Sequence, residues 1–526
     1  MEKRLTRRNF LRMIGATAGS AVLMQTMQGL GVLAESSYTG PPQLEGGGNG
    51  KKILILGAGL AGMTSALELS QQGYEVEILE FNDRAGGRVW SVRRGTRFEE
   101  LGGAVQYVNF EDGEYFNPGP WRIPYSHKAL LDYCRRLGVD LQVFINHNRN
   151  TLIHRTGNNN GEPVSRMPTT ADFVGYTSEL LSKATNQGAL DEELTSEDRE
   201  RLLEALRTWG ALNEDYEYTG GSRRGYDEYM GAGHRPGVPS EAQPLEQLLS
   251  GEAWRALGAE WGYEALTMFQ PVGGMDQIAA GFERQIGHLI RYRSKVTEIR
   301  QDDGEVRVRY ENLDSGEIEE ATGDYCICTI PLSVLSQIRT DFSPEFQEAI
   351  TSIPYGAATK VGLQFKRRFW EEDDRIYGGI TSTDLPISQI AYPNYNFFNQ
   401  KGVVLGAYTF GGDISHKVTG MSPEERIQWA LDNGRQVHPQ YDEEFDSGFA
   451  VGWHRVPWTL GCSASWIGTT REDYYDTLLQ PDGRVYLAGE HLSYLGAWME
   501  GAILSALDVI EAVHDRAMSS EETARA

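Results

Sequence analysis

The sequence predicts an α/β fold built on a parallel sheet, and three observations lead to this prediction. Residues 53–56 form a short, continuous apolar run, as expected for a strand that is buried on both faces. A glycine-rich turn and a helix-forming stretch over 60–72 follow it directly. A second strand, predicted over 74–80, then ends in an acidic residue, Glu80. This order of elements is that of a Rossmann-like, dinucleotide-binding unit.

Each part of the unit has a physical reason. Gly57 permits the tight turn, Gly59 lets the backbone approach a pyrophosphate, and Gly62 lets the helix pack closely on the strand. The helix N-terminus directs free N–H groups and the positive end of its dipole at the phosphates. Glu80 lies about 20 residues after the first glycine, where a carboxylate accepts ribose hydroxyls. A lone GxGxxG would be weak evidence, but this one has its strand, helix and acid in place.

A second glycine-rich turn, DRAGGR over 83–88, follows the acidic strand end. Two glycines alone would indicate an ordinary surface turn. Together with the first motif, the sequence resembles the FAD-binding amine oxidase superfamily, which includes monoamine, polyamine and L-amino-acid oxidases. The resemblance implies FAD as the cofactor, a discontinuous FAD-binding domain of the GR2 type, and Arg88 as one of the residues that bind it.

Length and composition limit the possibilities. The 526 residues allow two or three domains of roughly 100–200 residues each. With 40% hydrophobic and 10% aromatic residues, a large core is expected. The net charge of −25 argues against nucleic acid as a partner, since nucleic-acid binding needs a basic surface. The four cysteines show no metal-ligand spacing, so we expect no metal site and no disulfide framework.

The N-terminus predicts export. Residues 6–12 match the twin-arginine signal, a weakly hydrophobic stretch follows over 13–33, and 32–34 offer a small-residue cleavage site. We therefore expect a signal peptide over 1–34 and a periplasmic or secreted protein whose FAD is bound before export. The alternatives are a basic tail or a membrane anchor. Polar interruptions argue against stable membrane insertion after signal removal, and the Gly- and Pro-rich residues 35–50 are expected to form a linker.

The rest of the chain is divided by composition and by the resemblance. We expect the FAD-binding domain over 51–118, 271–332 and 478–517, because buried strands return at 323–330 and 483–490. A mixed-sheet substrate-binding domain is predicted over 119–165 and 333–477, with strands at 360–365, 390–392 and 402–409. Helical spacing predicts a helical subdomain over 166–270. Residues 518–526 are expected to be a flexible tail.

The resemblance also assigns residues to the cofactor. Glu490 is implied to contact the ribityl chain and pyrophosphate, and the backbone of Val296 to meet the adenine. The helix predicted over 498–515 points its N-terminus at the flavin ring, where its dipole favours negative charge. For the tryptophans among these residues, simple packing is the alternative. The remaining residues implied to bind FAD are Gly102, Gly103, Ala104, Trp121, Arg122, Trp453, Ala497, Trp498 and Met499.

Four residues are implied to act on the substrate. Arg122, in GPWRIP, matches the GPMRxP segment of L-amino-acid oxidases, whose arginine binds the substrate carboxylate through two parallel bonds. Tyr392 is implied to join it, Trp498 to wall the cavity, and Lys360 to assist the reaction with oxygen through its charge. The alternatives are an exposed arginine, a packing tyrosine or tryptophan, and a solvated lysine.

One departure from the family concerns the segment before Arg122. The LGGA turn over 101–104 and the GPWR segment are separate here, whereas the venom-type oxidases merge them. The intervening loop, 106–117, is expected to cap the cavity. His234 and Trp458 are further candidates for the substrate pocket. Cys462 lies where monoamine oxidases attach FAD covalently; non-covalent FAD is predicted, with a thioether as the alternative.

The predicted function is oxidative deamination of L-amino acids, with a preference for large or aromatic side chains. The products would be 2-oxo acids, ammonia and hydrogen peroxide, with oxygen as the second substrate. The alternatives are a primary-amine or polyamine oxidase, an amino-acid 2-monooxygenase, and a flavin-bearing binding protein without turnover. A homodimer is the family expectation.

Overall fold

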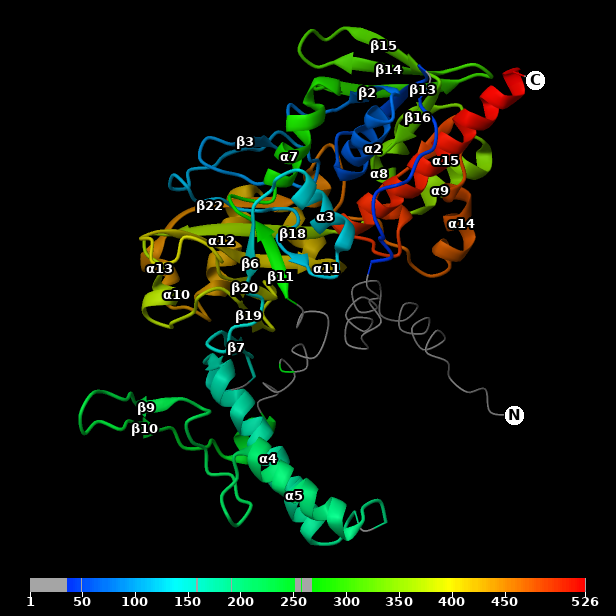
Figure 1. The fold of residues 1–526 in the computed structure, drawn as a ribbon. Coiled ribbons are helices and arrows are strands. Elements are labelled where there is room, and N and C mark those ends of the chain that lie inside the picture. The colour runs from blue at the N-terminus through cyan, green and yellow to red at the C-terminus, as the bar shows by residue number, and fades with distance from the viewer. Residues whose placement is uncertain are drawn as a thin grey trace.

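A computed structural model describes residues 36–48, 50–157, 159–190, 192–250, 257 and 267–525. The predicted signal peptide, 1–34, lies outside the described residues. The chain forms a nucleotide-binding lobe, a lobe built on a mixed sheet, and a helical lobe that projects away from both (Figure 1). No helix among the described residues has the length and apolar character needed to cross a membrane.

The nucleotide-binding lobe is built on five parallel strands in the order β12-β2-β1-β16-β23. Helix α2 follows β1, and the C-terminal helix α15 packs with it in one core. The α/β prediction is therefore confirmed, and the sheet takes its strands from three distant parts of the chain. The elements are β1 (Lys52–Leu56), α2 (Leu60–Gln71), β2 (Glu75–Leu79), β12 (Ile290–Arg291), β16 (Tyr325–Cys328), β23 (Val485–Leu487) and α15 (Met499–Arg525).

A second, four-stranded sheet lies beside the first, in the order β15-β14-β13-β17. The sequence predicted one strand over 323–330, but the chain turns at Asp324, which pairs with Lys51 at 2.8 Å and separates β15 from β16. The elements here are α7 (Gln277–Ile286), β13 (Ser294–Gln301), β14 (Val306–Asn312), β15 (Ile318–Gly323), α8 (Leu332–Leu335), β17 (Arg339–Thr340), α9 (Pro344–Ser352) and α14 (Thr470–Leu479).

The mixed sheet has seven strands in the order β22-β18-β21-β20-β19-β7-β8. Every residue of strand β18 is buried, including the polar residues Thr359, Lys360 and Gln364. Its strands are β7 (Leu152–His154), β8 (Val164–Ser165), β18 (Ala358–Phe365), β19 (Ile380–Thr383), β20 (Gln389–Ala391), β21 (Gly402–Phe410) and β22 (Phe445–Gly452), and its helices are α10 (Phe369–Glu372), α11 (Gly412–Thr419), α12 (Pro423–Gly434) and α13 (Tyr441–Glu444).

Smaller elements connect the two lobes. They form a hairpin and a three-stranded sheet, ordered β5-β11-β6. In the chain, β5 and β6 precede the mixed-sheet strand β7, whereas β11 comes after β8. Helix α3 packs into the same core as α2 and α15. These elements are β3 (Arg97–Glu99), β4 (Val105–Tyr107), β5 (Ile123–Pro124), α3 (Lys128–Arg136), β6 (Leu141–Phe144) and β11 (Met268–Pro271).

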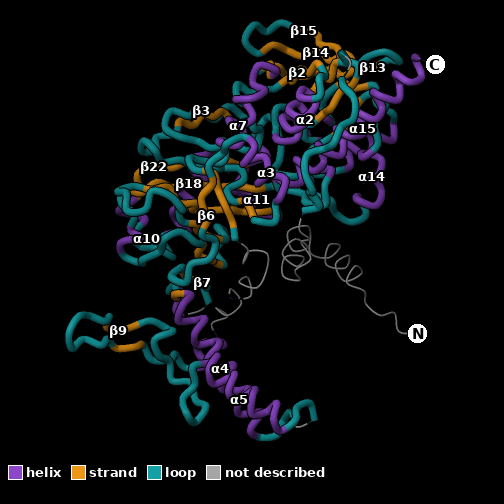
Figure 2. Tube along the Cα trace, in the orientation of Figure 1, coloured by secondary structure: helices purple, strands orange, loops and turns teal. Residues whose placement is uncertain are grey.

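The helical lobe consists of two long helices and an extended hairpin (Figure 2). A buried ion pair between Asp172 and Arg224, at 2.8 Å, ties the segment before the hairpin to the first helix. Its elements are α4 (Arg166–Asn186), α5 (Ser196–Gly210), β9 (Tyr226–Glu228), β10 (Val238–Pro239) and α6 (Leu245–Ser250).

The expected flexible tail over 518–526 is not seen where the chain is described. Helix α15 continues to Arg525. Residues 518–525 contain neither glycine nor proline, so nothing in the sequence ends the helix after Ala517. The C-terminal end of the chain therefore extends α15 instead of leaving it.

Candidate cofactor and substrate site

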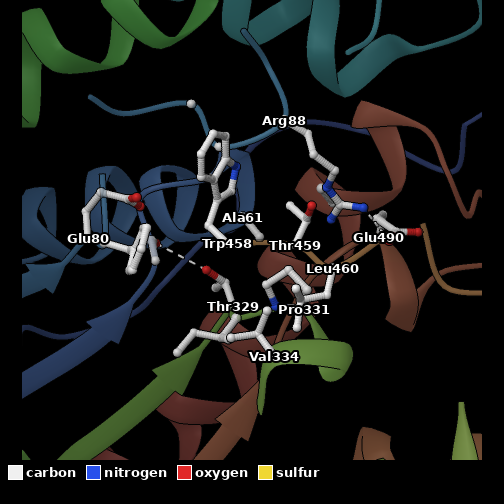
Figure 3. A pocket seen from close by; sticks show the side chains of 18 of the residues that line it. Ala61, Glu80, Arg88, Thr329, Pro331, Val334, Trp458, Thr459, Leu460 and Glu490 are labelled. Carbon is white, nitrogen blue, oxygen red and sulfur yellow. Dashed lines mark hydrogen bonds and ion pairs between the residues drawn. The ribbon is translucent and has the colours of Figure 1, made fainter. Parts of the chain in front are cut away.

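One cavity of about 670 Å³ collects most of the residues that the motifs singled out. It lies at the carboxyl ends of the parallel strands, where α/β sheets bind their ligands. The turns after β1, β2, β16 and β23 all contribute to it (Figure 3). Their lining residues include Gly57, Gly59, Glu80, Thr329, Gly489 and Glu490.

The three glycines of the first turn have different surroundings. Gly57 has a φ of 100°, and a Cβ there would lie 2.8 Å from the Thr329 hydroxyl. A Cβ on Gly62 would lie 2.0 Å from the carbonyl oxygen of Gly57, so the helix could not pack. At Gly59 a Cβ would meet no atom within 4 Å, and this residue lines the cavity. Helix α2 also begins there without a side-chain cap, so the cradle fits a phosphate group.

Glu80 is fixed at the cavity wall by its neighbours. One carboxylate oxygen accepts the N–H of Ala58 at 2.7 Å. The other accepts the backbone N–H and the side-chain amide of Asn82, at 2.8 and 2.7 Å. Burial raises the pKa of Glu80, although these donors act in the opposite direction. The carboxylate is therefore held in one orientation and fits a ribose hydroxyl as hydrogen-bond acceptor.

The second glycine turn supplies a buried cation beside the cavity. The guanidinium of Arg84 lies 5.4 Å from the ring of Trp458, which lines the cavity. Its Nη2 is buried and has no hydrogen-bond acceptor among the described residues. Burial lowers the pKa of Arg84 to about 10. A buried cation with an unused donor fits an anionic ligand such as a pyrophosphate.

Arg88 and Glu490 join the second turn to the last strand of the sheet. Their side chains point toward each other in Figure 3 and form an ion pair of 2.8 Å. The other carboxylate oxygen of Glu490 accepts the N–H of Ala497 at 2.9 Å, just before α15 begins. Burial acts to raise the pKa of Glu490, but the Arg88 charge and this N–H outweigh it and lower the pKa. The pair therefore fixes the start of α15 relative to the first motif.

We expect Arg88→Met to lower the free energy of unfolding by about 3 kcal/mol, because it leaves the Glu490 carboxylate buried without its partner. Flavin content should fall with it. Urea unfolding followed by fluorescence, together with flavin absorbance, measures both effects. Adding Glu490→Gln should recover part of the loss. If the double variant were no more stable than Arg88→Met, the loss would not come from the unpaired charge.

Several other predicted cofactor residues line the same cavity. Val296 lines the cavity at a β-bulge, where the register between β13 and β14 shifts. A bulge disrupts the hydrogen-bond ladder between the strands locally. Trp453 is buried and donates its indole N–H to the carbonyl of Pro118 at 3.1 Å. The remaining lining residues of this group are Ala497, Trp498 and Met499, and Trp458, a predicted substrate-pocket residue, lines the cavity as well.

Arg122 and Lys360 lie next to the cavity wall, although neither is a lining residue. Arg122 donates a hydrogen bond to the side-chain oxygen of Asn146. Lys360 is 1% exposed and donates to the backbone carbonyls of Asn117, at 3.5 Å, and Gly119. Burial lowers the pKa of Lys360 to about 7, and the nearby Arg122 charge also lowers it. The structure therefore brings two cations to one end of the cavity.

The predicted role of Tyr392 is wrong. Its hydroxyl is used by Thr381 at 2.8 Å and by His438 at 2.6 Å, inside the core of the mixed sheet. Neighbouring residues of an extended chain point to opposite sides, so Ala391, not Tyr392, belongs to the cluster near the cavity.

Tyr408, on the adjacent strand β21, was missed by the sequence reasoning. It lines the cavity and packs edge-to-face on Trp121 at 6.2 Å. The Lys360 ammonium lies 4.3 Å from its ring. The tyrosine that follows the apolar run over 403–407 was the signal that could have identified it.

The predicted cofactor contacts of Gly102, Gly103 and Ala104 are also not found. Both glycines are exposed in the turn between β3 and β4, and of the LGGA turn only Leu101 lines the cavity. The loop 106–117 does not cap the cavity either, because none of its residues line it. Pro118, Gly119 and Pro120, which follow this loop, line the cavity instead.

Two further candidates differ in their outcome. His234 is exposed in the loop between β9 and β10 on the helical lobe and does not line the cavity, so its proposed place in the pocket is wrong. Cys462 does line the cavity, and its carbonyl accepts a hydrogen bond from Arg88 at 2.7 Å. All four cysteines are free thiols.

Comparison with known proteins identifies the family. The family model described as flavin containing amine oxidoreductase matches residues 60–514, which is most of the chain. The chain belongs to the flavin-containing amine oxidoreductases. The family implies FAD, and the Gly59 cradle, the fixed Glu80 carboxylate and the buried Arg84 fit that cofactor.

Individual relatives of this amine oxidoreductase support the assignment. YobN of Bacillus subtilis (strain 168), provisionally named an L-amino-acid oxidase, is 32% identical over 486 residues, covering 87% of this chain and 94% of the relative. The L-amino-acid oxidase of Bothrops atrox is 27% identical, with coverage of 87% and 88%.

Solved structures show the same fold. Putrescine oxidase bound to putrescine has a TM-score of 0.59 at 16% identity, covering 88% of this chain and 98% of that one. Cyclohexylamine oxidase from Brevibacterium oxydans IH-35A has a TM-score of 0.58 at 17% identity, with coverage of 89% and 99%. This amine oxidoreductase therefore has the architecture of amine oxidases.

Proposed function

We propose that the enzyme oxidatively deaminates L-amino acids with large or aromatic side chains. The products are 2-oxo acids, ammonia and hydrogen peroxide. The observation that carries the proposal is the position of Arg122, which is held by Asn146 and Trp121 beside the cavity wall. A simple amine has no group for a guanidinium to bind, whereas an amino acid presents a carboxylate that accepts two parallel hydrogen bonds. The names of the relatives support the same substrate class.

The residues around the cavity have different roles in substrate binding and catalysis. Arg122 binds the carboxylate, and Tyr408 replaces Tyr392 as the phenol on this side of the cavity. Trp458 and Trp498 wall the cavity and exclude water from the reacting carbon. When bound, FAD supplies the redox chemistry by accepting a hydride from the carbon that bears the neutral amine. Water then hydrolyses the released imino acid, and oxygen takes up the two electrons and two protons as hydrogen peroxide.

A peroxide assay with L-phenylalanine, D-phenylalanine and phenylethylamine tests the proposal. We expect peroxide from the L-amino acid, together with one equivalent each of 2-oxo acid and ammonia. Activity on phenylethylamine alone would identify an amine oxidase, and an amide product would identify a 2-monooxygenase. Flavin that no substrate bleaches would indicate a binding protein. Each of these outcomes would overturn the proposal.

The attachment of FAD is a separate proposal. Burial raises the pKa of the Cys462 thiol, which disfavours the reactive thiolate. We therefore propose that FAD is bound without a covalent link. Acid precipitation should leave the yellow colour in the supernatant, whereas colour in the pellet of a Cys462-containing protein, lost in Cys462→Ala, would show a thioether. Export through the twin-arginine pathway and homodimer formation also stay predictions.

A further inference from the structure

Trp121 contacts both cations of the proposed substrate site. The guanidinium carbon of Arg122 lies 5.0 Å from the centre of its ring. The Nζ of Lys360 lies 5.2 Å from the same side chain's ring. Cations are attracted to the face of an indole, and more strongly where water is excluded. One side chain is therefore in position to hold both positive charges.

The indole is itself held in place. Phe144 meets it edge-to-face at 5.3 Å and an interplanar angle of 82°. Tyr408 meets it at 6.2 Å and 89°. Trp498 lies in the same small apolar cluster. These contacts hold the indole rigidly, whereas a methionine at this position would be flexible and would have no ring face to offer a cation.

We propose that Trp121 is a specificity-determining residue, which fixes the spacing of Arg122 from Lys360 and thereby selects amino acids whose amine and carboxylate share one carbon. The inference depends on the proposed function, in which Arg122 binds the carboxylate, and on the predicted role of Lys360 in the reaction of the flavin with oxygen. The spacing of the two cations then sets how many bonds separate the carboxylate from the reacting carbon. A β-amino acid places one more carbon between its carboxylate and its amine-bearing carbon than an α-amino acid does, so one fixed spacing cannot suit both. Small errors in such placement are costly to rate.

The first test compares substrates in the holoenzyme. The wild type should have a kcat/KM for L-phenylalanine at least 100-fold above that for β-phenylalanine. Trp121→Met should reduce this ratio at least tenfold, mainly by raising KM for L-phenylalanine. Trp121→Phe should reduce it about threefold, because a benzene ring attracts cations more weakly than an indole. Trp209→Met, at a half-exposed tryptophan on α5, is the matched control and should leave the ratio unchanged.

The second test measures binding without turnover. The probe is 3-phenylpropanoate, which has the carboxylate and no amine to oxidise. Calorimetry with the oxidised holoenzyme should show about tenfold weaker binding for Trp121→Met and no change for Trp209→Met. Flavin content and the thermal midpoint of each variant are measured alongside. If Trp121→Met does not fold, Trp121→Phe decides both tests.

The outcomes separate the inference from the proposed function. A wild type that releases no peroxide from L-phenylalanine would overturn both. A wild type that prefers α-amino acids, with folded Trp121 variants that keep the same preference and the same affinity for 3-phenylpropanoate, would overturn the inference alone. A graded loss from tryptophan to phenylalanine to methionine supports it, because a purely structural role would not follow the strength of the cation–ring attraction.

Discussion

Arg122→Met is expected to lower kcat/KM for L-phenylalanine by about 1000-fold. The substrate carboxylate would lose two charge-assisted hydrogen bonds from the guanidinium, each contributing about 1.5–3 kcal/mol. Activity on phenylethylamine, where the wild type shows any, should stay within about threefold, because that substrate has no carboxylate. Steady-state peroxide release with both substrates measures the difference.

Arg201→Met is the matched control for this variant. Arg201 lies on α5 with its side chain 71% exposed, so the substitution should change neither substrate's rate. The fluorescence-monitored unfolding midpoint of Arg122→Met shows whether the fold is intact. A folded Arg122→Met enzyme that keeps its activity on L-phenylalanine would refute the role of Arg122 in carboxylate binding.

Lys360→Met is expected to slow the reaction of the reduced enzyme with oxygen by about 100-fold. Losing one group that stabilises the charge developing in a transition state typically has an effect of this size. Anaerobic reduction by L-phenylalanine should change far less. Burial lowers the pKa of Lys360 to about 7, so the ammonium is present below this pH and lost above it. The wild-type rate with oxygen should therefore fall as the pH rises through about 7.

Two variants give the pH test its control. In Lys360→Met the rate with oxygen should be low and should not depend on pH near 7. In Lys360→Arg the charge persists at every pH in the range, so the fall near pH 7 should disappear while the rate stays well above that of Lys360→Met. Stopped-flow mixing with oxygen at several pH values measures all three proteins. A wild-type profile that stays flat from pH 6 to 9 would contradict this account of Lys360.

The nucleotide-binding unit could be predicted from sequence because its determinants are local. Gly57, Gly62 and Glu80 act within one β-α-β unit, and their spacing alone encodes the steric and hydrogen-bonding requirements. The link between Arg88 and Glu490 joins residues that are 402 positions apart. Only the resemblance could suggest that contact, since no local pattern relates two such distant residues.

The sequence-based predictions were wrong where a shift of one residue, or the path of a loop, decides which side chain faces the cavity. Tyr392 and Ala391 are neighbours, but they face opposite sides of the mixed sheet, and only the strand register decides which one faces the cavity. The sequence shows how long the turn at Gly102 and the following loop are. It does not show where their backbone runs. His234 was suggested by its residue type alone, and the projecting hairpin carries it away from the cavity.

The nucleotide-binding sheet has a consequence for the order in which the protein is made. Its first strand begins at Lys52, and its last, β23, begins only at Val485, with α15 packing after it. A growing chain on the ribosome therefore carries the opening motif and β2 long before β16, β23 and α15 exist. The apolar faces of β1 and α2 stay incompletely buried until most of the chain has been made. Exposed apolar surfaces of this kind favour aggregation or chaperone binding. Flavin uptake thus belongs to the end of synthesis, and any chain cut before β23 should lack a complete site.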